Sequence, residues 1–597
     1  MEKTVKNSNK YKKGAITGLI SGFLILIALN IIFSFIYFRI DLTKDKRHSL
    51  SPATIKLLKE LDDRIYIRVY LKGDGLPADY QHFAKNTKDI LQDFRNYSNK
   101  VFFEFIDPVA GKNQEEIISI FGEFGRKGLM PIPITKESNT GFSTVYVVPG
   151  VMISYKNNEK PVTLVVDDPS RSESWLTYST QEMEYNLVSA IRSLVKDRKP
   201  KVAFVEGHGE LGFLPTSWIT YQLRRFYQVD RITIDGKINS LRNIAIADSV
   251  EQTIVGRGNK YDALIIAQPT QPFSDEDKFI IDQHIMRGGK VLWLIDATTA
   301  STDSFQHRRD FFVTAQNLRL NDLFFRYGVR INANLLQDLS CQRIPVATGQ
   351  IGDQLKTKLM IFPYALNVVN FSTHPIVRNI KSIKADFVSS IDFVGGQDVE
   401  KTILMTSSER TKMVPTPSIV TLNVGLAKPN MEEFAFKRLP IAVLVEGIFE
   451  SAYKGLLPPE FDSIKEFGFL SQSKHTRQIF VADGDIIRNQ IDRKNGYPYP
   501  TGYDIYTQTK YDNSEFIMNC IKYLCADDDL LQIRTKNFRI GKLDKIKILN
   551  KSTFYAVINI VLPLVLIITM GIISNIIRRF RYYHKSSKKL SKTDYLK

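Results

Sequence analysis

A histidine and a glutamate lie two residues apart in the segment Gly207-His208-Gly209-Glu210. An imidazole next to a carboxylate is a pair that polarises a water molecule or holds a metal ion. The two glycines equally favour a tight turn at the end of a strand, in which the polar pair satisfies backbone groups. The turn is the simpler interpretation, because alternate spacing in a glycine-rich turn is not specific for either chemistry.

Two carboxylates flank a glycine in Asp483-Gly484-Asp485, and Arg488 and Asn489 follow. The pattern resembles one arm of a calcium loop, but the distal glutamate and the remaining ligands of such a loop are missing. A turn at a strand end is the alternative, in which Arg488 pairs with one of the acids. The candidate binding residues of the whole chain are Gly207, His208, Gly209, Glu210, Asp296, Asp483, Asp485, Arg488 and Asn489. No metal site, cofactor or catalytic residue is predicted.

The groups that drive nucleotide hydrolysis or acyl transfer are missing from the sequence. It contains no G-x-x-x-x-G-K-[ST] loop to hold ATP phosphates, and the nearest glycine-lysine cluster, residues 256–260, lacks the spacing. The three cysteines, Cys341, Cys520 and Cys525, form neither a CxxC nor a zinc pattern. Cys341 also lies outside the strand-to-helix turn that a nucleophilic cysteine needs. We therefore expect a protein that is not an enzyme.

The elements around the two polar turns are typical of an α/β domain. Buried strands are predicted over residues 202–205, 263–267 and 291–295, and a helix capped by Ser274 follows the second. Alternating buried strands and amphipathic helices indicate a mainly parallel sheet. This part is similar to class I glutamine-amidotransferase-like folds, but Asp296 stands where that chemistry needs a cysteine.

The preceding region predicts a smaller α/β domain. A helix begins at Ser51-Pro52, and a strand over 65–71, a helix over 78–97 and a strand over 101–106 form a βαβ unit with parallel strands. Paired strands are predicted within 142–166 around a turn at 156–160, and a helix over 180–196 ends the domain. The order suggests a thioredoxin-like layer without a redox CxxC.

Two apolar stretches, residues 14–38 and 553–577, are each long enough to cross a bilayer as a helix. The first has the basic flank of a signal peptide, but its apolar run exceeds a signal core and no small-x-small cleavage site follows. A buried helix is the alternative for the second, although a basic tail follows it. We expect two transmembrane anchors with the central region on one side of the membrane.

The net charge of +18 is concentrated in the two tails. Residues 1–13 contribute +4 and residues 578–597 contribute +7, which leaves +7 for the long central region. This dilute charge excludes a phosphate-tracking surface, so we predict no nucleic-acid partner. The tails fit anionic lipid headgroups. Near the spans, the tails carry 12 Lys and Arg and the inner flanks carry 9, a small excess that favours cytoplasmic termini.

Residues 39–43 and 49–52, the turn at 207–210, the turn at 288–290 before a strand ending at Asp296, and residues 482–489 together resemble the GldG family. These are gliding-motility-associated ABC transporter substrate-binding or auxiliary proteins. The resemblance implies an exported central region, held in the periplasm by two anchors in the cytoplasmic membrane, that works with a separate ABC permease and ABC ATPase. Two spans make a poor translocation path on their own.

The expected protein is an accessory or substrate-binding subunit of an ABC transporter linked to gliding motility. The alternatives are a structural protein that couples the transporter to an envelope component, and a hydrolase-like enzyme that uses the His208 and Glu210 turn. The expected parts are a basic tail (1–13), a first span (14–38), a thioredoxin-like domain (39–196), an amidotransferase-like α/β domain (197–530), a juxtamembrane segment (531–552), a second span (553–577) and a second basic tail (578–597).

Overall fold

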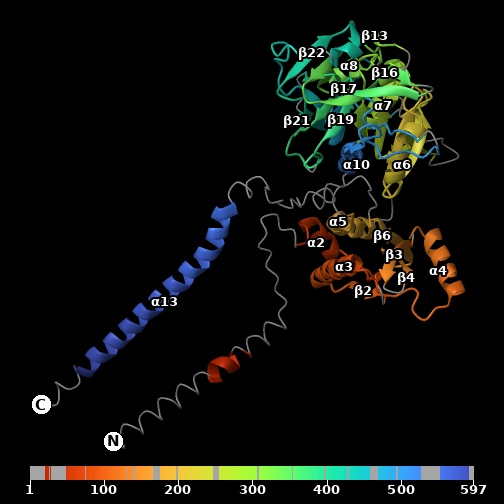
Figure 1. Cartoon of the computed structure of the whole chain (residues 1–597). Helices are drawn as coiled ribbons and strands as arrows, with labels where there is room; N and C mark the ends of the chain where they lie inside the picture. The colour runs from red at the N-terminus through yellow and green to blue at the C-terminus, as the bar shows by residue number, and fades with distance from the viewer. Residues whose placement is uncertain are drawn as a thin grey trace, which may run out of the picture. The chain divides into compact units, whose positions relative to one another are not determined.

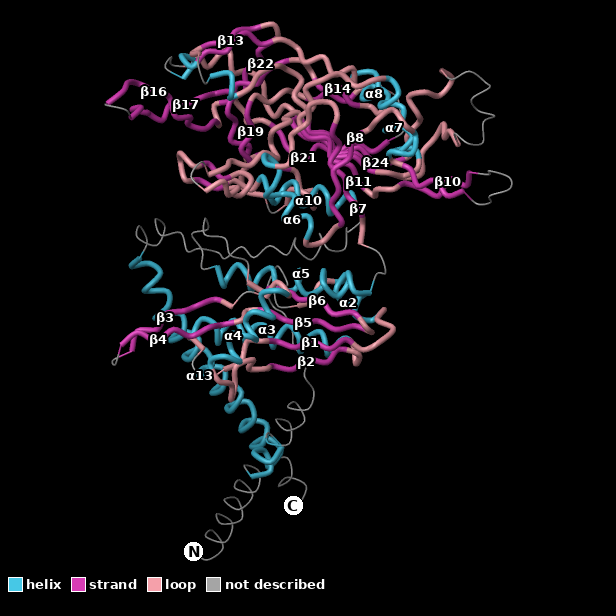
Figure 2. The backbone as a smooth tube through the Cα atoms, turned by 90° about the vertical axis from the view of Figure 1, so that its right-hand side faces the viewer, coloured by secondary structure: helices cyan, strands magenta, loops and turns pink. Residues whose placement is uncertain are grey.

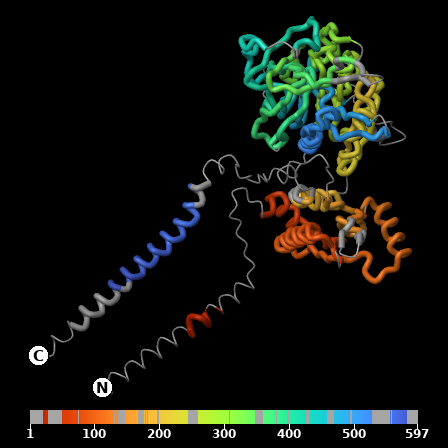
Figure 3. Tube along the Cα trace, viewed as in Figure 1, coloured from red at the N-terminus to blue at the C-terminus, as the bar shows by residue number. Residues whose placement is uncertain are grey.

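The computed structural model divides into two compact units, residues 1–537 and 538–597, and each is described by itself (Figure 1). The structure describes residues 20–25, 27, 49–73, 76–129, 131–138, 141–165, 175–195, 199–246, 254–305, 308–351, 354–378, 380–395, 399–425, 429–456, 468–492, 495–525 and 552–590 (Figure 3).

A four-stranded sheet organises the first part of unit 1. Its elements are α2 (Pro52–Lys59), β1 (Ile65–Val69), α3 (Ala78–Tyr97), β2 (Val101–Phe105), α4 (Gln114–Arg126), β3 (Ile132–Ser138), β4 (Gly141–Val147), β5 (Gly150–Tyr155), β6 (Asn158–Thr163) and α5 (Trp175–Val195). The strand order is β2-β1-β5-β6, and β3 pairs with β4 separately. β1 and β2 are parallel, as predicted, whereas β5 and β6 are antiparallel to their neighbours.

One face of this sheet forms a core with the long helices. Ile65, Ile67 and Val69 alternate inward from β1, and Phe83 and Phe94 of α3 are buried in the same cluster. Ser51 caps α2 by accepting a hydrogen bond from the Thr54 amide at 3.1 Å, which confirms the predicted helix start. The alternate apolar residues of the strand and the apolar stripe along one side of the helix therefore pack into the same core.

Two predicted boundaries in this part are wrong. The predicted turn at residues 156–160 is shorter, because residues 158–160 already belong to β6. β6 lies at the sheet edge, so its polar Asn158 and Glu159 are exposed there and look like loop residues in the sequence. Lys156 takes a positive φ of 52° to close the short connection. The last helix, α5, begins at Trp175 rather than at residue 180.

An eight-stranded sheet organises the second part of unit 1. Five parallel strands are β7 (Lys201–Glu206), β8 (Gln228–Thr233), β11 (Ala263–Ala267), β12 (Lys290–Leu294) and β25 (Thr476–Val481). Three further strands are antiparallel neighbours: β24 (Pro440–Gly447), β21 (Val399–Thr406) and β18 (Asn370–Phe371). The order is β18-β21-β24-β25-β12-β11-β7-β8, so the predicted mainly parallel sheet is present with an antiparallel extension.

Helices cover both faces of this sheet. α6 (Ser217–Arg224) and α10 (Asn513–Leu524) pack on one face, and α7 (Asp275–Met286) and α8 (Asn321–Arg326) pack on the other (Figure 1). β11 is buried at every position because both of its faces are covered. Ser274 caps α7 as predicted, accepting from the Asp277 amide at 3.0 Å.

A β-rich region lies between β12 and β25. Its most prominent feature is a long hairpin of β16 (Cys341–Ile351) and β17 (Gln354–Val368), which the sequence analysis did not predict (Figure 2). The remaining elements of unit 1 are η1 (Leu214–Thr216), η2 (Ile238–Ser240), β9 (Arg242–Ile246), β10 (Ile254–Asn259), η3 (Thr302–Phe305), β13 (Asp310–Val313), β14 (Val329–Ile331), β15 (Asn334–Asp338), β19 (Ile383–Asp386), β20 (Ile391–Phe393), β22 (Thr411–Pro415), β23 (Ser418–Thr421), η4 (Leu422–Gly425), β26 (Tyr503–Asp504) and β27 (Thr509–Lys510).

Unit 2 contains one long helix, α13 (Ser552–Leu590). Its segment Val557–Ile577 has 21 residues with a mean hydropathy of 2.6 and buries nothing within the protein. At 1.5 Å per residue such a segment spans roughly 30 Å, the thickness of a bilayer core. Of the first apolar stretch, 14–38, only residues 20–25 and 27 are described, all in helix, so the first span stays a prediction. The predicted tail 1–13 lies outside the described residues.

Candidate functional site

The carboxyl edge of the large sheet is the natural place to look for a site. The strand that follows β7 in the chain is β8, which pairs with one side of β7, and the next strand of this sheet, β11, pairs with the other side. The strand order therefore reverses between β7 and β11. In open α/β sheets, ligands bind in the crevice that such a switch point leaves beyond the carboxyl ends of the strands. The predicted turn at residues 207–210 follows β7 directly and therefore lies at this position.

Backbone hydrogen bonds tie together the two loops at this switch point. The His208 carbonyl accepts hydrogen bonds from the amides of Thr270 and Gln271, both at 2.9 Å, which ties the turn after β7 to the loop after β11. Gly209 has a φ of +73°, and a Cβ atom there would lie 2.1 Å from the Thr270 Oγ1 atom. The glycine is thus required both for the backbone conformation and for the close approach of the two loops.

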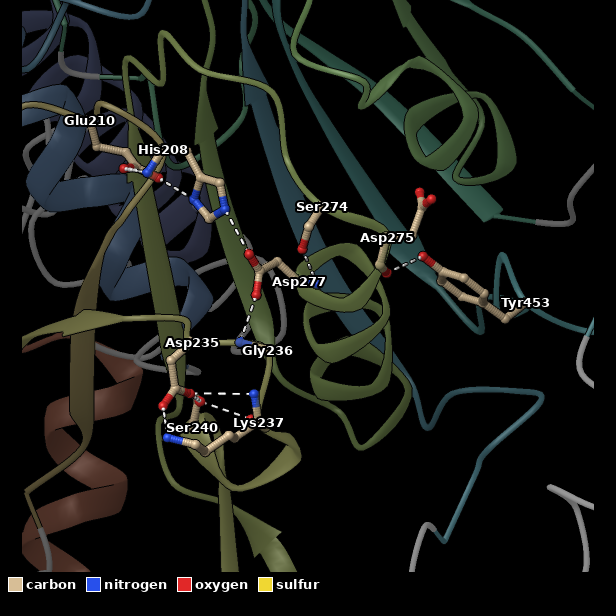
Figure 4. A network of polar contacts seen from close by, with 10 residues as sticks. All are labelled: His208, Glu210, Asp235, Gly236, Lys237, Ser240, Ser274, Asp275, Asp277 and Tyr453. Atoms are coloured by element: carbon tan, nitrogen blue, oxygen red, sulfur yellow. Dashed lines mark hydrogen bonds and ion pairs between the residues drawn. The ribbon is translucent and has the colours of Figure 1, made fainter.

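His208 lies between two carboxylates. Its Nδ1 atom is 3.1 Å from Oε1 of Glu210, and its Nε2 atom is 3.1 Å from Oδ2 of Asp277 (Figure 4). The ring also stacks on Phe273, with ring centroids 3.7 Å apart. The residue is only 4% exposed, so both ion pairs are shielded from water.

This environment favours the charged form of His208. Burial on its own lowers the pKa of the imidazole, but the hydrogen bonds and charges of Glu210 and Asp277 outweigh burial and raise it. An imidazolium donates from both nitrogens, which matches a carboxylate on each side. In that form His208 has no lone pair with which to accept a proton or bind a metal ion.

The two carboxylates are themselves held by backbone groups. The Glu210 Oε2 atom accepts from the His208 amide at 2.7 Å, and the Asp277 Oδ1 atom accepts from the Gly236 amide at 3.1 Å (Figure 4). Asp277 belongs to the first turn of α7, where a negative charge is favourable. The network therefore joins the end of β7, the start of α7 and the turn after β8, which is the work of a structural brace.

The predicted acidic residues meet at the ends of β12 and β25. The Asp296 carboxylate accepts from the Gln268 side-chain amide at 2.7 Å and from the Gly484 backbone amide at 2.5 Å. A Cβ atom on Gly484 would lie 3.0 Å from the Asp296 carboxyl, so a larger residue there would push this carboxyl away by a few tenths of an ångström. Asp483 is fully buried and accepts from the Asp386 amide at 3.2 Å.

Burial and mutual repulsion raise the pKa values of these acids. The pKa of Asp296 is raised by burial and by the charge of Asp386, and that of Asp483 is raised well above its usual range by burial and by Asp485. Burial, followed by the charges of Asp296 and Asp386, raises the pKa of Asp485 to about 7. The cluster consequently retains protons near neutral pH instead of carrying a full set of charges.

The cation interpretation of the Asp483-Gly484-Asp485 turn finds no support in the geometry. Within the described ranges, no group of three His, Cys, Asp or Glu side chains is placed to hold a metal ion. A cation does approach the edge of the cluster, since the Lys384 ammonium lies 3.7 Å from carboxylate oxygens of both Asp386 and Asp504. The turn after β25 thus brings together carboxyl groups and backbone amides.

The predicted pairing of Arg488 with one of these acids is wrong. Its guanidinium nitrogens lie 3.2 Å from Oδ2 of Asp303 in η3, on the exposed surface. The charge of Arg488 still acts on Asp485, whose pKa it lowers against the larger effect of burial, but its hydrogen bonds go to the exposed Asp303. This contact could not be foreseen because Asp303 lies 185 residues earlier in the chain.

Asn489 joins the loop after β25 to the start of α6. Its side-chain oxygen accepts from the Trp218 amide at 3.2 Å, and its side-chain nitrogen donates to the Leu214 carbonyl at 3.2 Å. The predicted residues therefore form separate contacts along one edge of the sheet, with His208 and Glu210 in one network and Asp296 and Asp483 in another. Asp277 and Asp386 also belong to these networks and were not among the predicted residues.

A second buried histidine lines a small cavity elsewhere in the domain. Burial, together with the charges of Lys290 and Arg287, lowers the pKa of His284 to about 3, so its ring is neutral. The cavity beside it has a volume of about 10 Å³ and also adjoins Arg242 and Arg287. Such a volume accommodates about one water molecule and is far smaller than a site for an organic ligand.

Comparisons with known proteins place the large domain in a family. Residues 199–520 match a family described as an ABC-type uncharacterized transport system, and residues 44–154 match a domain of unknown function (DUF7088). An uncharacterized protein of Borreliella burgdorferi (strain ATCC 35210 / DSM 4680 / CIP 102532 / B31) is 23% identical over 454 residues, which cover 74% of this chain and 80% of that protein. Among solved structures, the mmIFT52 N-terminal domain aligns over 54% of this chain and 96% of its own length, with 10% identity and a TM-score of 0.29, too low to carry an argument. By the match over residues 199–520, this chain belongs to the ABC-type uncharacterized transport system family of auxiliary transport proteins.

Proposed function

We propose that this protein is a membrane-anchored, non-catalytic accessory subunit that works with a separate ABC permease and a separate ABC ATPase. The observation that carries the proposal is the family match over residues 199–520, because it covers most of the large α/β domain. The missing phosphate-binding loop agrees with an energy source on another chain. The link to gliding motility and to the GldG family rests on the sequence resemblance alone.

The geometry of the candidate site supports a role without catalysis. His208, the one histidine in a turn at the switch point, is held on both sides by Glu210 and Asp277. A general base needs a free ring nitrogen within hydrogen-bond reach of its substrate, and neither nitrogen of His208 is free. The hydrolase-like alternative that relied on the His208 and Glu210 turn therefore has no support in this arrangement.

Coupling is the second candidate role. The hydrogen bonds of the His208 carbonyl with the Thr270 and Gln271 amides tie together the loops after β7 and β11, where an α/β domain usually holds a small ligand. This arrangement favours a rigid edge over a ligand site. We therefore infer that this subunit connects the transporter to another structure, and that any cargo is recognised elsewhere in the complex.

The proposed placement is a two-pass protein with its large central region in the periplasm and both termini in the cytoplasm. The apolar segment Val557–Ile577 supports the second anchor, and the basic residues that follow it support a cytoplasmic C-terminus in contact with anionic lipid. A parallel β1–β2 pair followed by an antiparallel β5–β6 hairpin supports the thioredoxin-like assignment. A parallel sheet covered on both faces supports the amidotransferase-like one.

Thiol labelling of the full chain in intact cells tests this topology. His475 is exposed in the large domain, so we place a cysteine there (His475→Cys) after replacing Cys341 and Cys525 by serine and keeping the fully buried Cys520. We expect a maleimide that cannot cross the cytoplasmic membrane to label this cysteine once the outer membrane is permeabilised. Cysteines placed at residues 3 and 597 serve as matched controls, which are expected to react only after lysis. Labelling of His475→Cys only after lysis contradicts the proposed placement.

A further inference from the structure

The small sheet ends in an edge strand that is unusually apolar. β2 (Val101–Phe105) is hydrogen-bonded to β1 on one side, and within the described chain no strand pairs with its other side. Four of its five residues are apolar, Phe102 is 38% exposed, and Tyr66 beside it on β1 is 47% exposed. The outer edge of β2 therefore presents unpaired backbone groups and aromatic side chains together.

Natural edge strands usually carry devices that prevent pairing with another chain, such as lysine, proline or a β-bulge. β2 contains none of these between Val101 and Phe105, and its register with β1 is continuous over all five positions. Its single charged residue is Glu104, which is exposed. An edge of this composition is suited to strand addition, in which main-chain hydrogen bonds supply the affinity.

Two opposite charges on this edge lack partners. The Arg64 guanidinium lies 5.7 Å from the centre of the Phe102 ring, on the face that also carries the stacked Tyr66 ring. On β1, Arg68 is level with Glu104 but pairs with Glu159 instead. In the part of the chain that the structure describes, neither Arg64 nor Glu104 forms an ion pair. They cannot pair with each other, because Ile65 is level with Val101 and about four residues at 3.3 Å each, roughly 13 Å, separate them along the sheet.

We propose that the occupant of this edge is a second copy of the same strand, which joins two sheets into one of eight strands. A two-fold axis at Phe103 places Phe103 opposite the partner's Phe103, and Glu104 opposite the partner's Phe102. Because Arg64 lies over Phe102, each Glu104 then meets the partner's Arg64. Two identical ion pairs result, flanking the central phenylalanine pair.

This charge pattern favours a second copy over an unrelated strand. A two-fold interface must be self-complementary, since residue i contacts residue j and residue j contacts residue i. This edge meets the condition. The Arg64 guanidinium, from the residue before β1, lies over Phe102 near one end of β2, Glu104 lies near the other end, and the centre is apolar. The side chain directly opposite each Glu104 is then the partner's Phe102, about 4.5–5.5 Å away at Cβ. The Arg64 guanidinium lies 5.7 Å from the centre of that ring, so Glu104 meets the arginine across the face of the phenylalanine.

Charge reversal in the full chain, purified in detergent micelles, tests the proposal. We expect light scattering to give a protein mass twice the 68.3 kDa of one chain for the wild type, and the mass of one chain for Glu104→Arg, in which two positive groups face each other. The double variant Arg64→Glu/Glu104→Arg restores opposite charges and is expected to restore the dimer. Asp89→Arg makes the same charge change on the exposed surface of α3 and is expected to leave the dimer intact.

A cysteine at the proposed two-fold axis supplies an independent measurement. In the background lacking Cys341 and Cys525, Phe103→Cys is expected to form a disulfide-linked dimer under mild oxidation, whereas a cysteine at the exposed Tyr97 is not. A monomeric wild type overturns the proposal. A Glu104→Arg variant that stays dimeric overturns it as well, because the two chains then associate through another surface such as the membrane helices.

Discussion

Replacing His208 with alanine is expected to lower the free energy of unfolding of the large domain by about 3–5 kcal/mol, the cost of breaking a buried ion pair by removing one partner. The substitution leaves the carboxylates of Glu210 and Asp277 facing an empty space, in a position that water reaches poorly. It also removes the ring that stacks on Phe273. Urea unfolding of the full chain in detergent micelles measures the change, followed by the fluorescence of the buried Trp293 in a background in which the other two tryptophans, Trp175 and Trp218, are replaced by phenylalanine.

The pH dependence of the free energy of unfolding distinguishes a charged His208 network from packing alone. Because the folded-state pKa of His208 is raised above 6.5, its stabilisation is complete below that pH and is lost as the pH rises through the raised pKa. The free energy of unfolding that His208→Ala loses relative to the wild type is therefore expected to be larger at pH 6 than at pH 9. His475→Ala, an exposed histidine of the same domain, is the control and is expected to change stability by less than about 0.5 kcal/mol. An equal deficit at both pH values contradicts the charged brace.

Replacing Asp485 with asparagine is expected to have the opposite sign and to stabilise the protein at alkaline pH. The pKa of this carboxyl is raised to about 7 by burial and by Asp296 and Asp386, so the folded state binds a proton that the unfolded chain releases near pH 4. The native carboxyl thus favours folding fully below pH 4, and that contribution is lost as the pH rises through about 7. Since Asp485 is only partly buried, we expect a gain of about 1–3 kcal/mol for the variant at pH 8, below the full linkage value.

Thermal or urea unfolding of both proteins from pH 4 to pH 8 measures this gain, which should be near zero at the acid end. The exposed Asp310 on β13 provides the matched control, because Asp310→Asn removes the same charge outside the cluster. The control is expected to be flat across the pH range. A variant Asp485→Asn that is less stable than the wild type at pH 8 contradicts this prediction, because the ionised carboxylate then stabilises the fold despite the repulsion within the cluster.

Local patterns predicted three of the five parallel strands of the large sheet, β7, β11 and β12, but not β8 and β25. The all-apolar run of β11 and the Ser274 cap of α7 depend on neighbours in the sequence, and both were found where expected. The β16–β17 hairpin was missed although its strands are adjacent in the sequence, because Pro345 and Gly349 interrupt the strand pattern of β16. The antiparallel strands β21 and β24 lie far along the chain from the parallel strands that they extend.

The candidate residues were predicted more readily from the sequence than the contacts that they form. The glycines at 207 and 209 indicated a tight turn, and His208 with Glu210 does satisfy a backbone group there. Asp277 was not predicted as a partner of His208, since their contact spans 69 residues of sequence. Arg488 was assigned to the wrong acid because local spacing does not reveal which carboxylate is buried.

Copurification from membranes tests the accessory-subunit account most directly. The full chain, tagged at its C-terminus, is extracted in mild detergent, and the bound proteins are identified by mass spectrometry, with an unrelated tagged two-span membrane protein as the control. The account predicts recovery of an ATPase with a phosphate-binding loop and a multi-span permease, both absent from the control. Recovery of neither, with the tagged chain itself intact and folded, contradicts the account.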